Sequence, residues 1–316
     1  MKYIIAVSGG VDSVVLLDMV VRHELFLSPS ESSWRTRESR ISRESRDTPA
    51  PIVNASDDAS ESSEFIVCHF DHGIRPESDA DARFVWELAK KYGLPCEIRR
   101  EELGPHASEA LARERRYMFL QEIAKKYDGK IVTAHHQDDV IETIAINVAR
   151  GTGWRGVAVL RNEMTARPLL GFTKQMLRDY ALAYRLEWVE DETNATDHYQ
   201  RNRLRHQLHR LPDNSRQSLL ELWNRQLSIR TELEKETANL ADNNKNSRYF
   251  FIMIPESVAL EFLRLQTNGR LTRPQLRAML LAIKTFRAGQ KFEAGNGIVV
   301  SIGLRYFTMK DPSGLI

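Results

Sequence analysis

The first half of the chain alternates short apolar runs typical of strands with longer segments in which apolar residues recur at the helical period. Strands are expected near residues 2–7, 65–70, 95–100 and 130–135. Helices are expected near residues 12–24, 77–92, 108–127 and 138–149. This alternation predicts an α/β fold, in which a Rossmann-like parallel sheet carries helices on both faces and binds ligands beyond the carboxyl ends of its strands.

Two regions depart from this pattern. Residues 28–63 are rich in Ser, Arg, Asp and Glu and hold few residues that could enter a core, which predicts a disordered surface insertion. An arginine-rich arm that becomes ordered on RNA is the alternative. Beyond residue 212 the pattern turns helical and ends in an expected hairpin at 291–309, where Gly-Asn-Gly supplies the turn. The expected domains are therefore 1–211 and a smaller, basic, mainly helical domain at 212–316.

Length and composition bound the class of protein. The 316 residues, of which 42% are hydrophobic, can build two cored domains. No apolar run approaches a membrane span and the first residues do not resemble a cleavable signal, so the cytoplasm is the expected compartment. The two cysteines, Cys68 and Cys96, lie in strand-like stretches without metal spacing, which argues against a zinc or iron–sulfur site built on cysteine.

Basic residues are concentrated in two places, although the formal net charge is only +2. The segment from Arg264 to Lys310 contains nine Lys and Arg and a single acid, Glu293. A second cluster of arginines and histidines lies between Tyr199 and Arg210. Solvated helix faces would explain either cluster alone. The two together favour a polyanionic partner such as RNA.

The segment SGGVDS, residues 8–13, follows the first strand and opens the first helix. Its glycines would let the backbone approach phosphate oxygens, its serines would add hydroxyl donors, and the helix start favours an anion. Asp12 would repel phosphate unless a divalent cation lay between them, and this implies Mg²⁺. The segment is neither a Walker loop nor a dinucleotide fingerprint. An ordinary glycine turn is the remaining alternative.

This segment resembles the pyrophosphate-loop (PP-loop) signature of the ATP pyrophosphatases, which adenylate a carbonyl oxygen and release pyrophosphate. Six further motifs occur in the chain, namely HFDHGIRPES (69–78), EALARERRY (109–117), AHHQDDVIET (134–143), RGTGWRGV (150–157), RPLL (167–170) and DETNATDHYQRNRLR (191–205). Together they are similar to those of the tRNA(Ile)-lysidine synthetases, in a short form with one accessory domain. The likeness covers residues 1 to about 210 apart from the insertion, and more loosely the C-terminal domain.

The resemblance implies a ligase that forms a carbon–nitrogen bond. It would use ATP to adenylate the C2 oxygen of the wobble cytidine in a tRNA(Ile) with a CAU anticodon. The side-chain amine of free L-lysine would then replace that oxygen to form lysidine, with release of pyrophosphate and AMP. The second domain would bind the tRNA, and a homodimer stays open. Such chemistry needs cations at the α-phosphate and a base for the lysine amine, whose pKa is about 10.4 in water.

The segment AHHQDDVIET is where such a base is expected. If a helix starts near Gln137, Asp139 and Glu142 share one face, pointing away from the apolar packing surface. By resemblance these two acids would face the lysine, whereas His135 and His136 would belong to the ATP side. Acids that simply favour a helix N-terminus are the alternative.

The site residues implied by the resemblance fall into three groups. The catalytic group is Asp12, Arg113, His135, Asp139 and Glu142. The nucleotide-binding group is Ser8, Gly9, Gly10, Val11, Asp12, Ser13, His69, Arg75 and His136, with Asp12 as the Mg²⁺ ligand. The lysine-binding or tRNA-binding group is Asp139, Glu142, Arg116, Arg167, Arg201, Arg203 and Arg205. Exposed arginines without a function are the alternative for Arg113 and Arg116.

Three competing functions share parts of this pattern. A tRNA thiolase delivers sulfur through reactive cysteines or a cluster, and no Cys-x-x-Cys is present. A synthetase fed by an amidotransferase would need a glutaminase, and neither cysteine sits in such a setting. A non-catalytic RNA-binding relic is disfavoured because Asp12, Asp139 and Glu142 are all present.

Overall fold

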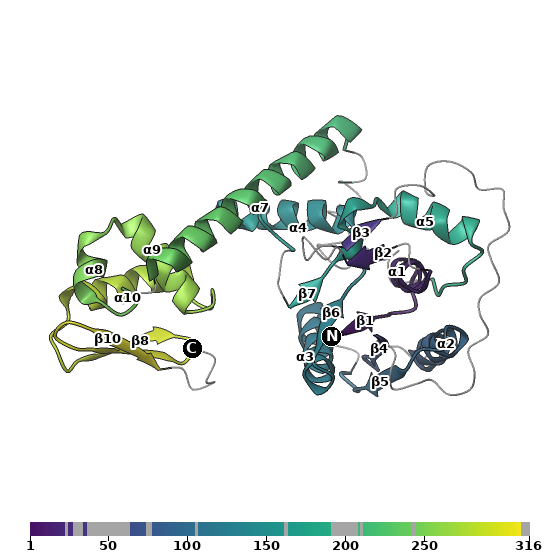
Figure 1. Ribbon diagram of the computed structural model, residues 1–316, viewed down its shortest axis with the longest axis horizontal. Helices are drawn as coiled ribbons and strands as arrows, with labels where there is room; N and C mark the ends of the chain where they lie inside the picture. Colours follow the sequence, from purple (N-terminus) through teal and green to yellow (C-terminus); the bar gives the residue numbers. More distant parts are fainter. Residues whose placement is uncertain are drawn as a thin grey trace. The chain divides into compact units, whose positions relative to one another are not determined.

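The computed structural model describes residues 1–22, 25–27, 34–36, 64–73, 78–104, 107–160, 164–190, 208, 211–241 and 244–310. The chain divides into two compact units, Met1–Asn224 and Arg225–Ile316. The division falls inside the long helix α7 (Asp213–Ala241), which is the diagonal helix in Figure 1. None of the helices in these ranges is long and apolar enough to cross a membrane.

The first unit is built on a five-stranded sheet. Its order is β5 (Cys96–Arg100), β4 (Phe65–Asp71), β1 (Lys2–Ala6), β6 (Gly129–Val132) and β7 (Thr165–Ala166). All four pairings are parallel, and Ile4 at the centre lies between Ile66 and Ile131. A parallel sheet is covered on both faces, which is why its central strands are almost continuously apolar. The α/β prediction is confirmed.

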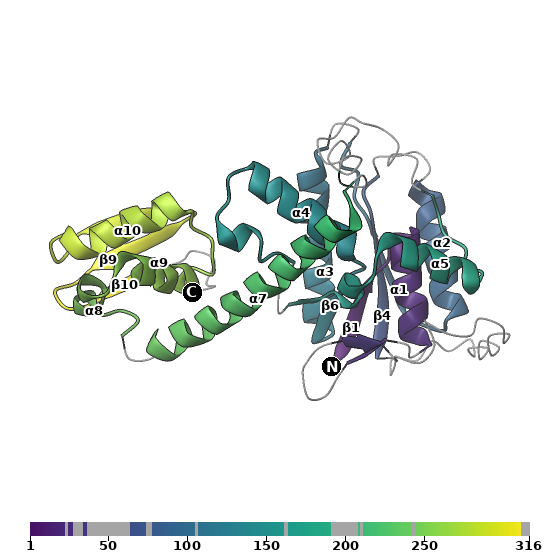
Figure 2. The same cartoon turned by 90° about the horizontal axis from the view of Figure 1, so that it is seen from above.

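Helices cover the two faces of this sheet, as Figure 2 shows. One face carries α1 (Val11–Val21), α2 (Ser78–Lys91) and α5 (Lys174–Ala183). The other carries α3 (Glu109–Lys126), and α4 (Gln137–Ala149) follows β6. Alternate residues of β1 enter separate cores, since Tyr3 and Ile5 pack with α1 and α5 whereas Ile4 packs with α3. The four strands and four helices expected in this half are all present.

The predicted insertion contains one element that the prediction missed. Strand β2 (Leu25–Leu27) pairs antiparallel with β3 (Trp34–Thr36). A short strand of this kind pairs through its backbone hydrogen bonds, which composition does not reveal, and the disorder expected for 28–63 stays a prediction. The remainder of 28–63 lies outside the described residues.

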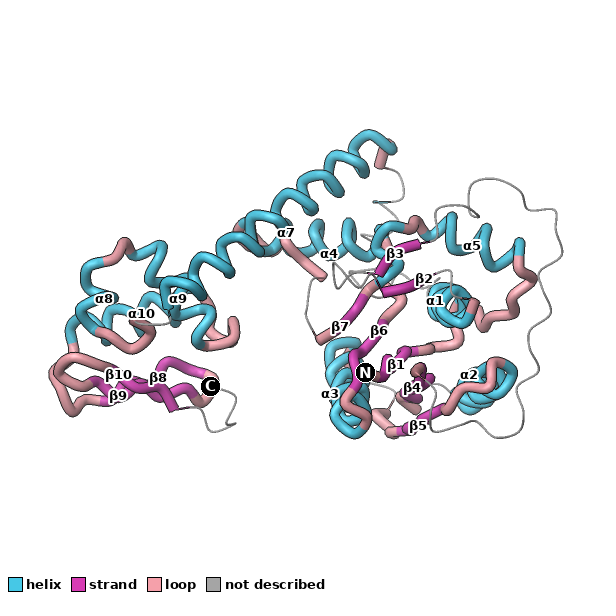
Figure 3. The backbone as a smooth tube through the Cα atoms, viewed as in Figure 1, coloured by secondary structure: helices cyan, strands magenta, loops and turns pink. Residues whose placement is uncertain are grey.

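The second unit begins within α7 and continues through three shorter helices. These are α8 (Arg248–Met253), α9 (Glu256–Gln266) and α10 (Arg273–Thr285). An antiparallel sheet of β8 (Lys291–Gly295), β9 (Ile298–Ile302) and β10 (Phe307–Lys310) follows, with β9 in the middle (Figure 3). The expected hairpin is the β8–β9 pair, whose turn has positive φ at Asn296 and Gly297. The sequence prediction missed β10 as a third strand. A core of aromatic and aliphatic side chains, including Phe251, Phe262 and Phe307, joins helices to sheet.

Candidate functional site

The segment from Ser8 to Ser13 forms a loop after β1 and continues into the first turn of α1, at the carboxyl edge of the sheet. Gly9 has φ +88°, a left-handed conformation that side chains other than glycine rarely adopt. The Ser13 hydroxyl donates to the Gly10 carbonyl (2.8 Å) and accepts from the Ser8 amide (3.1 Å). The two hydroxyls lie 3.2 Å apart. The serines therefore shape the loop through bonds within it, whereas the sequence had suggested only hydroxyl donors for a ligand.

Helix α1 starts within this segment. Gly10 is its N-cap, and Val11 and Asp12 are its first two residues. The first amides of a helix have no acceptor within the helix, and together with the helix dipole they favour an anion. His69 supports the loop from the neighbouring strand, because its buried ring has Nδ1 2.8 Å from the Val7 carbonyl oxygen.

Asp12 is held by a lysine that the sequence reasoning did not single out. The Lys174 ammonium donates to both carboxylate oxygens of Asp12, at 2.7 and 2.6 Å. Lys174 is the first residue of α5, where the Thr173 hydroxyl accepts from the Met176 amide and caps the helix. The ion pair links residues that are far apart in the sequence and near the carboxyl edge in the fold.

His136 lies between Asp12 and Asp139. Its Nε2 is 3.7 Å from an Asp12 oxygen and 3.6 Å from an Asp139 oxygen. Burial by itself lowers the pKa of His136, but the carboxylates of Asp138, Asp139 and Asp12 outweigh it, so the pKa is raised above its ordinary value. His136 is also the N-cap of α4, since its amide donates to Asp139 (2.9 Å). The motif of α4 thus meets the loop through this histidine.

Asp138 is a second functional candidate that the sequence reasoning missed. One of its oxygens accepts from the main-chain amide of Lys174 (2.9 Å) and lies 3.4 Å from Nδ1 of His136. The other accepts from the guanidinium of Arg216, in α7. Burial raises the pKa of Asp138, yet the donors from His136 and Lys174 and the charge of Arg216 outweigh it and hold that pKa well below its usual range. Asp138 therefore joins α4, α5 and α7.

His135 is a site residue whose pKa responds to three of the predicted arginines. Its Nδ1 is 2.8 Å from the Thr133 hydroxyl. Burial lowers the pKa of His135 to about 3; Asp139 opposes this, and the positive charges of Arg167, Arg113 and Arg116 add to it. The ring is neutral near pH 7. The charges of these three arginines, from α3 and from the segment after β7, therefore act on one imidazole.

The same three arginines have contacts with other residues. Arg113 and Arg116 both lie against the ring of Tyr117, with guanidinium carbons 5.2 and 5.9 Å from its centroid. Arg167 donates from one terminal nitrogen to the Leu160 carbonyl (2.8 Å). Among the described residues, no hydrogen-bond partner meets the buried Nε of Arg167 or the hydroxyl of Tyr117. Buried donors of this kind usually have a partner, which a ligand anion would supply.

Glu142 differs from its expected environment. It lies three residues after Asp139 on α4, as predicted, but it is only 3% exposed and is flanked by buried Val140, Ile141 and Ile144. The sequence pattern gave no sign that this side chain would be buried.

Four predicted residues, Arg75, Arg201, Arg203 and Arg205, lie outside the described residues. For Mg²⁺, the described ranges contain no group of three or more His, Cys, Asp or Glu placed to hold a metal. One carboxylate such as Asp12 still fits that ion, because Mg²⁺ is commonly bound by one or two carboxylates together with substrate phosphates.

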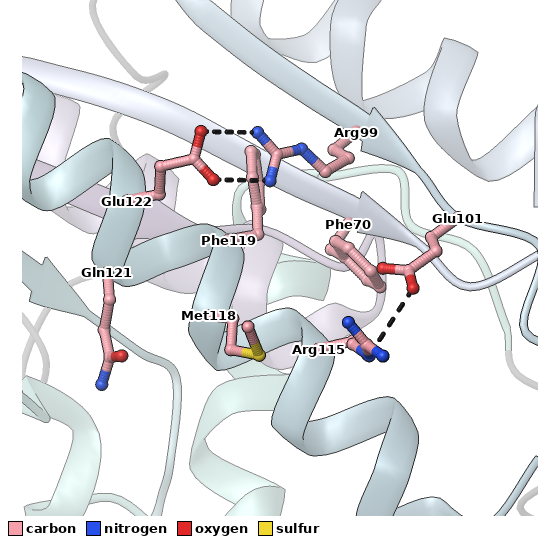
Figure 4. A pocket seen from close by; sticks show the side chains of 8 residues that line it. All are labelled: Phe70, Arg99, Glu101, Arg115, Met118, Phe119, Gln121 and Glu122. Carbon is pink, nitrogen blue, oxygen red and sulfur yellow. Dashed lines mark hydrogen bonds and ion pairs between the residues drawn. The ribbon is translucent and has the colours of Figure 1, made fainter. Parts of the chain in front are cut away.

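A surface pocket of about 340 Å³ lies elsewhere, between β5 and α3 (Figure 4). Its lining consists of Phe70, Arg99, Glu101, Arg115, Met118, Phe119, Gln121 and Glu122. Its arginines already have acidic partners, since Arg99 donates to Glu122 at 2.8 and 3.0 Å and Arg115 lies 3.6 Å from Glu101. None of the predicted site residues that the structure describes lines this pocket.

Known proteins resemble this chain in both sequence and fold. The tRNA(Ile)-lysidine synthase of Exiguobacterium sibiricum is 41% identical over 152 residues, which are 46% of this chain and 36% of that protein. The enzyme of the same name from Thermosipho africanus is 32% identical over 217 residues, 66% of this chain and 43% of that protein. The chain thus spans less than half the length of either relative. The U34-tRNA thiolase NcsA from Methanococcus maripaludis, solved with its [4Fe-4S] cluster, shares the fold with a TM-score of 0.50 and 14% identity over 72% of each chain.

The family model for the PP-loop domain matches residues 46–211, which are just over half of the chain. The chain belongs to the PP-loop domain family.

Proposed function

We propose that this chain is an ATP-dependent ligase that forms lysidine. It adenylates the C2 oxygen of the wobble cytidine of a tRNA(Ile) with a CAU anticodon and then joins free L-lysine at C2, releasing pyrophosphate and AMP. The observation that carries the proposal is His136, which lies between Asp12 of the loop and Asp139 of the AHHQDD motif. Lysidine synthases among the relatives support it.

In this proposal the loop binds the phosphates of ATP. The first amides of α1 and the dipole of that helix face the phosphates. Asp12 would hold a Mg²⁺ ion, which would supply positive charge against the phosphates. Arg113, Arg116 and Arg167, whose charges act on His135, neutralise charge that develops on the α-phosphate as the cytidine oxygen attacks it. Bond formation at phosphorus releases pyrophosphate.

The second step uses the acids of α4. Asp139 and Glu142 attract the ammonium of lysine and take the proton that the amine loses as it attacks C2. AMP then leaves with the former C2 oxygen. His135 stays neutral, because burial holds its pKa near 3, and a neutral imidazole beside the arginines can donate or accept a hydrogen bond without repelling either substrate.

The second unit supplies the surface for tRNA in this proposal. Exposed basic residues of this unit include Arg273, Arg277, Arg287, Lys291, Arg305 and Lys310. Two tyrosines, Tyr249 and Tyr306, are 72% and 63% exposed and could stack on unpaired bases. A cytoplasmic location fits a tRNA substrate and stays a prediction, as does a homodimer.

A thiolase is the weaker alternative on the same fold. Both thiols of the chain are free. Burial raises the pKa of Cys68 far above its usual range and raises that of Cys96 to about 12, so neither is a reactive thiolate near pH 7.

The test is incubation of the full chain with ATP, Mg²⁺, labelled lysine and an unmodified tRNA(Ile) that carries CAU, followed by mass analysis of the nucleosides. The proposal predicts one cytidine with the added mass of lysine. ATP cleavage to AMP and pyrophosphate without lysine on the RNA would contradict lysine as the nucleophile. Absence of cleavage would contradict the enzymatic function and favour the relic.

A further inference from the structure

Lys174 occupies both oxygens of the carboxylate that the proposed function assigns to Mg²⁺. Its ammonium lies 2.7 Å from one Asp12 oxygen and 2.6 Å from the other. A divalent cation bound to the same two oxygens would have to occupy the position of the ammonium. If both were present beside Asp12, the two positive charges would repel each other strongly. Lys174 and a metal therefore compete for Asp12.

The main chain at Lys174 is fixed, whereas its side chain can swing. Its amide donates to Asp138 (2.9 Å), and Thr173 caps α5. The helix is tied to α1, because the Tyr180 hydroxyl donates to the fully buried Asp18 (2.9 Å). The Lys174 side chain itself is 31% exposed. A lysine carries a compact charge on a flexible four-carbon stem, so the ammonium can leave Asp12 while its base stays beside the loop.

We propose that Lys174 is a ligand of the ATP triphosphate. When Mg²⁺ arrives with the nucleotide and binds Asp12, the ammonium of Lys174 transfers from Asp12 to the oxygens of the β- or γ-phosphate. The exchange leaves both the metal and the ammonium opposite the phosphates, and a lysine beside a helix N-terminus is a good point charge for such oxygens. No covalent bond changes in this step. The inference rests on the proposed use of ATP and needs neither lysine nor tRNA.

The experiment compares Lys174→Met with the unaltered chain by calorimetry, with Mg²⁺ present and without tRNA or lysine. ATP and AMP are the two probes, because AMP lacks the β- and γ-phosphates. Loss of a charge-assisted contact predicts ATP binding that is about tenfold to a hundredfold weaker, with AMP binding within about twofold of the unaltered chain. Equal losses for ATP and AMP would show a structural role and overturn the proposal. Unchanged ATP affinity would overturn it too.

A second readout uses Mn²⁺ alone, followed by the paramagnetic resonance of the free ion. Removal of the ammonium releases the Asp12 carboxylate, so Lys174→Met is expected to bind Mn²⁺ more tightly. Weaker or equal Mn²⁺ binding would contradict the competition at Asp12. Lys126→Met is the matched control, because Lys126 forms an ion pair of similar length with Glu97 (2.8 Å) on the edge strand β5. The control is expected to change none of these affinities.

If Lys174→Met does not fold, the same ATP and AMP affinities are measured on a second variant, Lys174→Arg. Arginine retains the charge and is expected to keep ATP affinity within about fivefold, whereas a loss as large for AMP as for ATP would overturn the proposal. Failure of the proposed function is seen separately. A chain that binds ATP but never forms lysidine contradicts the ligase and leaves the assignment of Lys174 intact.

Discussion

Arg216 of α7 donates to the carboxylate of Asp138 in the AHHQDD motif. Its other terminal nitrogen donates to the Leu208 carbonyl (3.2 Å). Trp223, about two turns further along α7, donates from its indole nitrogen to the Val159 carbonyl (3.0 Å). The first half of α7 is therefore anchored to the unit that carries the site. Because Asp138 also contacts His136 and the amide of Lys174, the anchor reaches the residues around Asp12.

Arg216→Gln is expected to lower the free energy of unfolding by about 1–3 kcal/mol, because it leaves the mostly buried Asp138 with one charged donor fewer. Urea unfolding measures the change. Arg178→Gln, an exposed substitution on α5, is the control and should have an effect within about 0.5 kcal/mol. A loss for Arg216→Gln no larger than that of the control would show that the ion pair adds nothing to stability.

The two histidines of the motif are expected to affect stability with opposite pH dependence. His135 has its pKa lowered to about 3, from 6.5 in the unfolded chain. As pH falls from 6.5 toward 3, the unfolded state therefore binds a proton that the folded state refuses, and stability is lost, on the order of 2 kcal/mol by about pH 5. His135→Gln should lose less stability than the unaltered chain on acidification from about pH 7 to about pH 5.

His136 has a raised pKa, so its folded state binds the proton more tightly than the unfolded state does. Its stabilising contribution is fully present below pH 6.5 and is lost as pH rises through the folded pKa. The loss of stability of His136→Gln relative to the unaltered chain should be largest below pH 6.5 and smaller above the folded pKa of His136. Unfolding curves across pH test both histidines, and parallel profiles for the two variants would contradict these assignments.

Glu142→Gln is expected to weaken the use of lysine more than the binding of ATP. The substitution keeps the shape of the buried side chain but removes the charge that attracts an ammonium, so the KM for lysine should rise at least about tenfold. Glu114→Gln, on the exposed face of α3, serves as the control. Equal losses for lysine and ATP would defeat the assignment of Glu142 to the amine.

Asp12→Ala is expected to abolish pyrophosphate release while the chain stays folded. The variant loses the carboxylate for Mg²⁺ and leaves Lys174 without its acidic partner, yet Asp12 is at a partly exposed helix start where alanine is tolerated. Pyrophosphate release is measured alongside the circular dichroism of the variant. Release at the unaltered rate would remove Asp12 from the mechanism.

Hydrophobic periodicity predicted the strands and helices of the first unit because those elements are long and buried on a regular face. It missed β7, which has only two residues, and β10, which follows a hairpin closely. Helix α5 was also missed, although Thr173 is a recognisable N-cap.

The candidate site was only partly predictable. Motif resemblance pointed to Asp12, His136 and Asp139, which the structure places together. Lys174 and Arg216 carry no local pattern, because their roles come from ion pairs with residues distant in sequence. The helical period of apolar residues could not predict the burial of Glu142. A helix face that carries acidic residues can still be covered by other segments of the fold.

The central claim, that the C2 oxygen of the wobble cytidine is adenylated and displaced by lysine, has one direct test. A tRNA(Ile) with a heavy oxygen isotope at C2 of that cytidine is incubated with the chain, ATP, Mg²⁺ and lysine, and the AMP released is weighed by mass spectrometry. The account predicts that AMP carries the heavy oxygen in equal amount to the lysidine formed. AMP with only ordinary oxygen, or heavy oxygen retained in the tRNA, would contradict it.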